Sequence, residues 1–405
     1  MNDLRNPFQE LVILELASVL AGPSVGQFFA ELGATVIKIE NTETQGDVTR
    51  KWKTITEDPE TDISAYFSCA NWGKKSVALN LKHPEELALL HKLAAKADVV
   101  LASYKPGDAE KLHVDYKSLA SLNPKLIYGH ITGYGPNAIR AGYDAVLQAE
   151  TGFMHLNGQA DGPPTKMPVA LIDVLAAHQL KEGILAALWA REKTGKGQLI
   201  QVSLRDAALA SLANQAANYL VAGQNPKRLG SEHPNIVPYG TVYEDLEDKP
   251  LVLAIGDDRQ FSNLCSILGQ PELADKPEFK TNNQRVKNRE ALQKHLKSQI
   301  KTWNREALLQ KLIEKNVPAG AVYNIAEVFS KPDAQAMLLK TSENEPFFKG
   351  RGVKQVAFKW QSYPDITTLP APPAFGQHTA EVKQELGLAT DNDPEHLGKM
   401  PSGDR

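Results

Sequence analysis

Residues 11–40 form a strand–helix–strand pattern that restricts the fold more than any other part of the chain. A short apolar run at 11–16 is followed by Pro23, which suits the first turn of a helix because that position needs no backbone N–H. Apolar residues at helical spacing follow, Gly33 ends the helix, and residues 35–39 are β-branched and apolar. Such a crossover predicts a parallel sheet covered by helices on both faces.

Strand-like and helical segments continue to alternate as far as residue 204, apart from a polar stretch at 41–62 that we expect to be a surface excursion. The alternation predicts a large α/β domain with a doubly wound, mostly parallel, Rossmann-like sheet. Residues 239–244 and 251–255 are then expected to form an antiparallel hairpin followed by amphipathic helices, which indicates a smaller α+β domain. The expected domains are the first segment of the large domain at 1–222, the small domain at 223–325, and a return to the large domain with a C-terminal tail at 326–405.

A dinucleotide-binding fold is one interpretation of the first unit, because Glu40 ends its second strand where a ribose-binding acid would lie. However, Gly22 and Gly26 are four residues apart and form no G-x-G-x-x-G, so the phosphate-binding loop is missing. We therefore expect no NAD site. Ligands on such sheets usually bind beyond the carboxyl ends of the strands, which here means residues 18–23.

The composition argues against several classes of protein. A net charge of −3 over 405 residues is typical of neither a nucleic-acid-binding nor a membrane-surface protein. No apolar run approaches the roughly 20 residues of a membrane helix, and the N-terminus resembles no signal or transit peptide. Cys69 and Cys265 lie far apart without metal or redox spacing, so we expect two buried thiols, no metal and a cytoplasmic location.

Asp173 is the candidate nucleophile. It lies between an apolar run at 167–172 and a long helix expected at 174–192. Aspartate is also a common helix N-cap, and its position alone leaves that structural role open. Apolar neighbours would desolvate the carboxylate, while the helix N-terminus would keep it ionised and directed at a ligand. A carboxylate in this setting can act as a covalent catalyst.

Segments along nearly the whole chain resemble the family III CoA-transferases, the CaiB/BaiF group that includes formyl-CoA and carnitine CoA-transferases. The most specific match is Pro168–Asp173 before a long helix, followed by Thr194-Gly195-Lys196-Gly197-Gln198. Further matches occur in the same order as in the family, at Ala21-Gly22-Pro23, Leu79-Asn80-Leu81-Lys82, Tyr104-Lys105-Pro106-Gly107, Asn123–Tyr128, Arg228-Leu229-Gly230, His233-Pro234-Asn235, Pro238-Tyr239-Gly240, Asp257–Phe261 and Val317-Pro318-Ala319-Gly320.

The resemblance implies that Asp173 attacks an acyl-CoA, for which succinyl-CoA is a plausible donor, and forms an aspartyl anhydride and then an aspartyl-CoA thioester. A carboxylic acid accepts the CoA, and backbone N–H groups at the helix start could stabilise the oxyanions. The resemblance also implies an interlocked homodimer. The implied coenzyme A contacts are Leu20, Ala21, Lys82, Ser103, Tyr104, Lys105, Lys111, Ala141, Tyr143 and Asp144.

Lysines suit the nucleotide phosphates and Tyr104 could stack on adenine, although a lysine taken singly is more often a solvated surface charge. The chain departs from the family at Ser103, where Asn is usual, and at Lys111, where Arg is usual. Contacts with the phosphates are therefore expected to differ in detail.

Two alternative functions remain open. The α-methylacyl-CoA racemases of this family carry Gly-His-Asp with an acid/base histidine, whereas this chain reads Gly142-Tyr143-Asp144, so we favour a transferase. His130 and His178 are better explained by core packing. The second alternative is a non-catalytic CoA-binding protein, and no motif identifies the acceptor acid.

Overall fold

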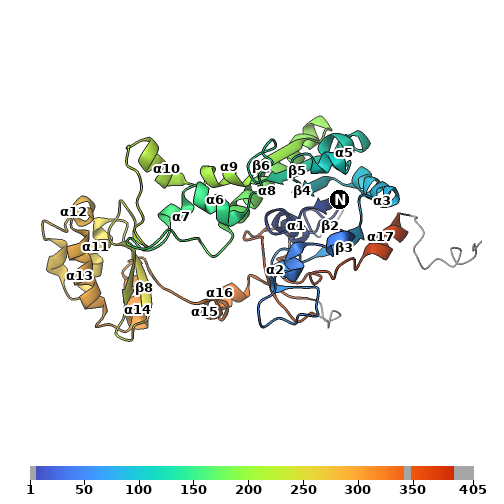
Figure 1. The fold of residues 1–405 in the computed structure, drawn as a ribbon. Helices are drawn as coiled ribbons and strands as arrows, with labels where there is room; N and C mark the ends of the chain where they lie inside the picture. Colours follow the sequence, from blue (N-terminus) through green and yellow to red (C-terminus); the bar gives the residue numbers. More distant parts are fainter. Residues whose placement is uncertain (1–5, 342–347, 387–405) are drawn as a thin grey trace, which may run out of the picture. The chain divides into compact units, whose positions relative to one another are not determined.

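The computed structural model describes residues 6–341 and 348–386, which fall into two compact units (Figure 1). The larger unit is drawn from Met1–Thr151, Pro168–Ala213 and Asp333–Arg405, and the smaller from Gly152–Met167 and Asn214–Pro332. These bounds differ from the domain ranges expected from the sequence. One cause is Arg228, whose guanidinium donates hydrogen bonds to the carbonyl oxygens of His155, Gln159 and Gly162 and so joins the segment 152–167 to the smaller unit.

The larger unit is built on six parallel strands, which confirms the expected parallel α/β sheet. The strands are β1 (Val12–Leu16), β2 (Thr35–Asn41), β3 (Lys74–Leu79), β4 (Val99–Ala102), β5 (Ile127–Thr132) and β6 (Leu199–Ser203). Their order is β3-β2-β1-β4-β5-β6, so the direction of winding reverses between β1 and β4. Doubly wound sheets usually bind ligands at this switch point.

Helices cover both faces of this sheet. Leu14 and Leu16 of β1 share a buried apolar cluster with α3 (Pro84–Lys96), α5 (Tyr116–Leu122) and α17 (Thr379–Glu385). The other face carries α1 (Ala21–Glu31) and α8 (Leu171–Thr194), which pack against each other. Every residue of α1 is buried, because α1 lies between the sheet, α8 and residues of the segment after 348.

The remaining elements of the larger unit are short. They are the 3₁₀ helices η1 (Thr42–Thr44) and η2 (Val48–Lys51), helices α2 (Ala65–Ser68), α4 (Asp108–Lys111), α6 (Asp144–Glu150) and α9 (Leu204–Ala210), and the strand pair β10 (Leu338–Leu339) and β11 (Gly352–Val353). Helix α16 (Pro332–Gln335) has its first residue in the smaller unit and the others in the larger one. In the part of the chain that the structure describes, no helix is both long and apolar enough to cross a membrane.

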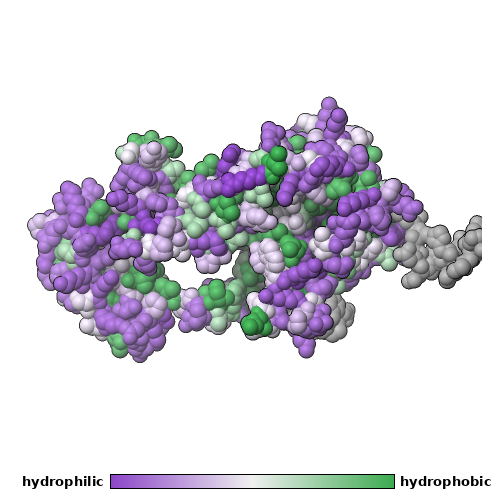
Figure 2. Space-filling view, in the orientation of Figure 1, coloured by the Kyte–Doolittle hydropathy of each residue, from purple (hydrophilic) through white to green (hydrophobic). Residues whose placement is uncertain are grey.

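The smaller unit contains a three-stranded antiparallel sheet with its own apolar core. Its strands are β7 (Tyr239–Glu244), β8 (Pro250–Ala254) and β9 (Ala319–Ala321), and its helices are α7 (Phe153–Leu156), α10 (Ala213–Leu220), α11 (Asp258–Ile267), η3 (Pro271–Ala274), α12 (Asn282–Lys287), α13 (Arg289–Ile300), α14 (Arg305–Glu314) and α15 (Ile325–Phe329). Figure 2 shows a mainly hydrophilic surface, with an apolar cluster at the place of α10, where Leu220 and Val221 are exposed.

A buried network of charges lies between the sheet and α1. Glu15 of β1 pairs with Lys38 of β2 at 3.0 Å and with Lys74 of β3 at 2.7 Å, and Lys38 also pairs with Asp47 at 3.0 Å. None of these side chains is more than 1% exposed. Gly26 of α1 lies so close that an added Cβ would be 2.0 Å from Glu15 Oε2, so a larger residue at this position would collide with the network.

The expectation that residues 41–62 form a surface excursion is wrong for the middle of that segment. Asp47 and Arg50 are 4% and 3% exposed. Arg50 pairs with Glu40 at 2.5 Å, and its guanidinium lies 3.8 Å from the centre of the Phe67 ring. The polar residues of this segment therefore complete the network inside the unit, because each buried charge has an opposite charge as its partner.

Candidate active site

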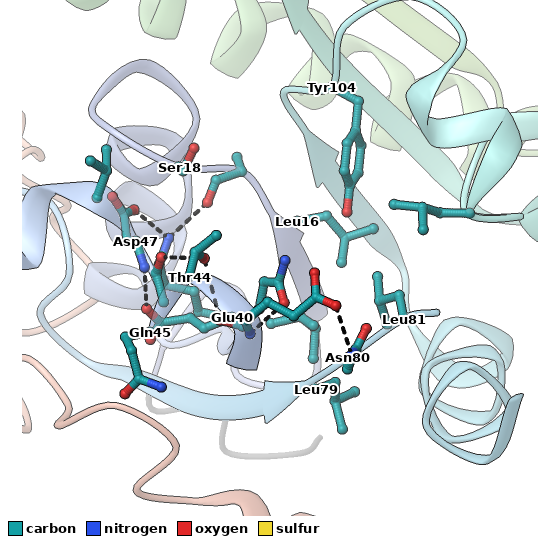
Figure 3. A pocket seen from close by; sticks show the side chains of 18 of the residues that line it. Leu16, Ser18, Glu40, Thr44, Gln45, Asp47, Leu79, Asn80, Leu81 and Tyr104 are labelled. Atoms are coloured by element: carbon teal, nitrogen blue, oxygen red, sulfur yellow. Dashed lines mark hydrogen bonds and ion pairs between the residues drawn. The ribbon is translucent and has the colours of Figure 1, made fainter. Parts of the chain in front are cut away.

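The carboxyl ends of β1 to β3 and the start of the segment after β4 line a cavity of about 610 Å³ at the switch point of the sheet. Figure 3 shows side chains from these elements around it, among them Ser18 after β1, Glu40 at the end of β2, Asn80 after β3 and Tyr104 after β4. The sequence predicted ligand binding at the end of β1, and the cavity adjoins that place. It is large enough to hold part of a nucleotide-sized ligand.

Two of the predicted coenzyme A contacts line this cavity. The ammonium of Lys82 is exposed and pairs with the carboxylate of Glu43 at 2.7 Å. Tyr104 is half-buried, its hydroxyl points toward Leu16 (Figure 3), and burial raises its pKa to about 12. A third predicted contact, Ser103, adjoins them, and its Oγ accepts a hydrogen bond from the backbone N–H of Ser18 at 3.2 Å.

The charge network beneath α1 holds the loop between β1 and α1 in place. Lys38 donates to the carbonyl oxygen of Ala17 at 2.7 Å, and Lys74 donates to that of Pro23 at 2.9 Å. Val19 adopts a positive φ of 71°, which is strained for a β-branched residue, and its N–H donates to the carboxylate of Asp47. Three buried charges therefore fix a strained loop at the mouth of the cavity.

Burial affects the two lysines of the network in opposite directions. Burial alone lowers the pKa of Lys38, but Asp47, Glu15 and Glu40 outweigh it, so the pKa is raised. Among the described residues, Lys74 forms an ion pair with Glu15 alone, and burial together with the neighbouring Lys38 lowers its pKa to about 8. Lys38 is therefore the more firmly charged of the two.

Asp173 lies in the first turn of α8, as the third residue of the helix. The helix begins at Leu171, and its N-cap is Ala170, which makes no side-chain cap. The alternative that Asp173 is an N-cap is therefore wrong, as is the expected helix start at 174. The side chain that caps the turn is that of Asp144, whose Oδ1 accepts a hydrogen bond from the N–H of Ile172 at 2.8 Å.

The environment of Asp173 favours its protonated form. Burial and, after it, the negative charge of Asp144 raise the pKa of Asp173 to about 7. The helix N-terminus does not outweigh this desolvation, so the carboxyl group ionises less readily than expected. The carboxylate makes no hydrogen bond or ion pair within the described residues, and its charge helps burial to raise the pKa of Tyr66 to about 12.

The backbone N–H groups at the start of α8 are already partly used. The N–H of Leu171 donates to the carbonyl oxygen of Val169 at 2.7 Å, and the N–H of Ile172 donates to Asp144. The expectation that these groups stabilise oxyanions is therefore not met for Leu171 and Ile172 in this conformation.

A second cavity, of about 800 Å³, adjoins the start of α8 within the larger unit. It is lined mainly by apolar atoms, and α8 contributes Val174, Ala177 and Lys181. The other walls come from the β1–α1 loop, from residues 57–69 and from residues 348–355, and they include Leu20, another predicted contact. Cys69 also lines the cavity and is exposed, contrary to expectation, whereas Cys265 is buried as predicted.

The family model described as CoA-transferase family III matches residues 8–379 of this chain. The chain belongs to this family. Two similar relatives are the succinate–glutarate CoA-transferase of Agrobacterium fabrum and the succinyl-CoA:glutarate CoA-transferase of Homo sapiens. The first is 40% identical and covers 95% of this chain and 98% of the relative, and the second is 35% identical and covers 95% and 87%.

Solved structures agree with this assignment. A CaiB/BaiF family protein from Brucella suis has a TM-score of 0.81 and 38% sequence identity, covering 94% of this chain and all of that one. Rv3272 from Mycobacterium tuberculosis has a TM-score of 0.80 and 27% identity, covering 93% of this chain and 98% of that one. The protein is therefore a CoA-transferase.

Other predicted contacts of this CoA-transferase are not part of either cavity lining. Lys105 is exposed, and so is Lys111, which pairs with Asp108 at 3.1 Å. Ala141 is exposed, as is Tyr143 just before α6, whereas Ala21 is buried as the first residue of α1. Asp144, whose carboxylate caps the start of α8, likewise lines neither cavity. For all ten predicted contacts, those that line a cavity included, coenzyme A binding stays a prediction.

The sequence reasoning did not find several polar residues of this CoA-transferase near the two cavities. Asp47 and Lys181 are examples, and both are buried. A signal for the network was present, because Glu15 lies among apolar residues of β1 and Lys38 between two isoleucines of β2. A charge in a buried strand implies a buried partner.

His178, expected in the core, is exposed, whereas His130 is half-buried and its Nε2 contacts the carbonyl oxygen of Tyr104 at 3.0 Å.

Proposed function

We propose that this enzyme moves CoA from an acyl-CoA to a carboxylic acid through covalent intermediates on Asp173. The observation that carries the proposal is the state of this carboxylate, which is desolvated, has no hydrogen-bond partner within the described residues, and lies next to a cavity-lining residue, Val174. A carboxylate placed only for stability would normally be paired or hydrogen-bonded when buried.

In the first half of the proposed reaction, the Asp173 carboxylate attacks the thioester carbonyl of the acyl-CoA. The carbon–sulfur bond breaks, which leaves an aspartyl anhydride and CoA thiolate. The thiolate then attacks the aspartyl carbonyl of the anhydride, so the donor acid leaves as its carboxylate and an aspartyl-CoA thioester remains. Each step is an acyl transfer with a good leaving group, which is the usual gain of covalent catalysis.

In the second half, the acceptor carboxylate attacks the aspartyl-CoA carbonyl and releases the thiolate again. A second anhydride forms, now between Asp173 and the acceptor. The thiolate attacks the acceptor carbonyl, which yields the new acyl-CoA and returns Asp173 as a free carboxylate. No proton is gained or lost overall, so the enzyme needs a nucleophile and a binding site for each acid but no separate general base.

The raised pKa of Asp173 supports this role. Desolvation makes the ionised form less stable and therefore a better nucleophile than an ordinary aspartate. A pKa of about 7 still leaves a large ionised fraction at neutral pH. The environment thus increases reactivity while keeping much of the enzyme active.

For the substrates, we propose that coenzyme A extends from the cavity at the switch point, where Lys82 and Tyr104 lie, toward Asp173. Succinyl-CoA is the proposed donor and a small dicarboxylic acid the proposed acceptor. Two relatives with these chemistries in their names, the glutarate enzymes of Agrobacterium fabrum and Homo sapiens, support this choice. From the family resemblance we also propose an interlocked homodimer.

The direct test is to trap the intermediate. After incubation with succinyl-CoA, hydroxylamine should convert Asp173 to a hydroxamate that peptide mass spectrometry detects. Asp173→Ala should abolish CoA exchange, whereas Asp206→Ala, which changes an exposed aspartate of α9, should not. Full activity of Asp173→Ala would refute the mechanism. Exchange of the α-proton in deuterated water would favour an epimerase, and CoA binding without exchange for any acid would favour a non-catalytic protein.

A further inference from the structure

Lys181 is a buried cation that has no anionic partner in the part of the chain that the structure describes. It is only 5% exposed, lies two turns after Asp173 in α8, and lines the second cavity. Within the described residues its ammonium makes no hydrogen bond or ion pair, and the contact it does make is with the Phe28 ring, whose centre is 5.1 Å away. A buried ammonium normally has a partner, because removing it from water costs much free energy.

The charged groups around Lys181 do not supply this partner. Glu31 and Glu182 both act to raise the pKa of Lys181, but neither forms an ion pair with it within the described residues. The Glu31 carboxylate already accepts hydrogen bonds from Gln27 and from the backbone N–H groups of Gln355 and Val356, and Glu182 accepts one from Gln179. Burial is the main reason that the pKa of Lys181 is lowered, which agrees with a cation that lacks full compensation. The side of Lys181 that faces the cavity is therefore where an anion could bind.

The other charged residues of the lining are already engaged. The carboxylate of Glu57 accepts hydrogen bonds from the backbone N–H groups of Thr54 and Ala65. The guanidinium of Arg351 is exposed and donates to Gln335 at 3.1 Å. Among the charged residues that line this cavity and that the structure describes, Lys181 thus has no polar partner yet, and an incoming anion would be its first.

The position of Lys181 relative to Asp173 limits the size of that anion. Val174, Ala177 and Lys181 are spaced as one stripe of α8, and Asp173 begins beside it. Eight residues correspond to about 12 Å along the helix axis, and long side chains in a helix lean back toward its N-terminus. A side chain with this lean brings its ammonium nearer to Asp173 than the backbone distance, and Ala177, which also lines the cavity, has a small side chain.

We propose that Lys181 binds the distal carboxylate of a dicarboxylic acid whose other carboxyl group reacts at Asp173. This inference rests on the proposed function and specifies the acid, namely an α,ω-dicarboxylate with a short apolar chain. Val169, Val174 and Ala177 would contact the methylene groups, and Lys181 would pair with the far carboxylate. A monocarboxylic acid would leave the buried ammonium unpaired, so the site discriminates against it.

Lys181→Met tests this directly, because methionine has a similar length and no charge. Glutarate and pentanoate have carbon chains of equal length and differ in the second carboxylate. We expect the ratio of kcat/KM for glutarate over that for pentanoate, measured with one common donor, to fall about 10- to 100-fold in Lys181→Met. Lys181→Arg should restore part of the ratio, and Lys193→Met, which changes an exposed lysine of the same helix, should leave it unchanged.

A binding measurement separates this inference from the catalytic proposal. Glutarate should raise the melting temperature of the wild-type enzyme and of Asp173→Ala, and it should not do so for Lys181→Met. An equal loss of kcat/KM for both acids in Lys181→Met, or an unchanged thermal shift with glutarate, would overturn the role of Lys181. Full CoA exchange by Asp173→Ala together with a changed acid ratio in Lys181→Met would overturn the mechanism alone.

Discussion

The carboxylate of Asp144 completes the first turn of α8 by accepting a hydrogen bond from the backbone N–H of Ile172 at 2.8 Å, one residue before Asp173. Gln148 holds the same carboxylate from the other side, donating from Nε2 to Oδ2 at 2.8 Å. Asp144 thus stabilises the helix start as a side-chain cap would. It also contributes a negative charge that helps to raise the pKa of the neighbouring Asp173.

The first prediction concerns the pH dependence of catalysis. Because the ionised form of Asp173 is the proposed nucleophile and its pKa is about 7, activity should increase with pH and level off above neutrality. We expect kcat/KM to fall about tenfold for each pH unit well below this midpoint. Initial rates of CoA exchange between pH values on either side of the midpoint would measure it.

The second prediction separates the charge of Asp144 from its hydrogen bond. Asp144→Asn keeps a side-chain oxygen for the N–H of Ile172 but removes the charge, so the midpoint of the pH profile should move to lower pH. Asp144→Ala removes both and should also lower the melting temperature, because the cap is lost; capping side chains typically contribute about 1 kcal/mol. A pH midpoint in Asp144→Asn equal to that of the wild type would show that the two carboxylates do not interact.

The third prediction concerns the free energy of unfolding that the enzyme loses when the buried Asp173 ionises. The pKa of this group is 3.8 in a model compound and about 7 in the folded protein, so the folded state keeps its proton to higher pH than the unfolded state. The protein therefore loses stability as the pH rises from the lower value to the higher one. Asp173→Asn removes this penalty and should increase the free energy of unfolding by up to about 4 kcal/mol at alkaline pH.

Denaturant unfolding of wild type and Asp173→Asn across this pH range would measure the difference. The two proteins should converge in acid, where Asp173 is protonated in both states. An equal difference at every pH would mean that ionisation of Asp173 is not its cause.

Local patterns predicted the first strands of the parallel sheet well, because the runs at 11–16 and 35–39 are rich in apolar and β-branched residues and are observed as β1 (Val12–Leu16) and β2 (Thr35–Asn41). The start of α8 was misplaced, since residues 167–172 are apolar whether extended or helical. The charge network was missed for a different reason. The charged residues within β1 and β2 indicate that buried partners exist, but the local sequence does not show that Asp47 is the partner that tertiary structure brings to Lys38.

The fourth prediction distinguishes lysines that line the nucleotide-sized cavity from those that do not. Lys82→Ala should weaken coenzyme A binding about tenfold, because a cation at the cavity is lost, whereas Lys105→Ala should change it less than about threefold. Glu43→Gln should tighten binding by about twofold to fivefold, since it frees Lys82 from its ion pair. Titration calorimetry with coenzyme A would measure all three. Equal effects of the two lysine variants would contradict the proposal that the phosphates of coenzyme A bind at Lys82.

The fifth prediction tests the buried network. Lys38→Met leaves Glu15 and Asp47 without their shared cation and should lower the free energy of unfolding by about 3–5 kcal/mol. Lys75→Met is the matched control on β3, because Lys75 forms a partly exposed pair with Glu381, and its cost should stay below about 1 kcal/mol. Urea unfolding gives both values, and similar costs for the two variants would contradict a stabilising role for the network.

The interlocked charges beneath α1 also bear on how new acid preferences evolve in this enzyme. A single substitution at Glu15, Lys38 or Asp47 removes an ion-pair partner from a buried charge, and Gly26 allows no added side chain. We therefore expect few substitutions around the loop at 17–23 to be tolerated. Lineages that adapt to a different acid are therefore expected to vary at the opposite wall, along α8 and residues 348–355, while the first loop is inherited almost unaltered.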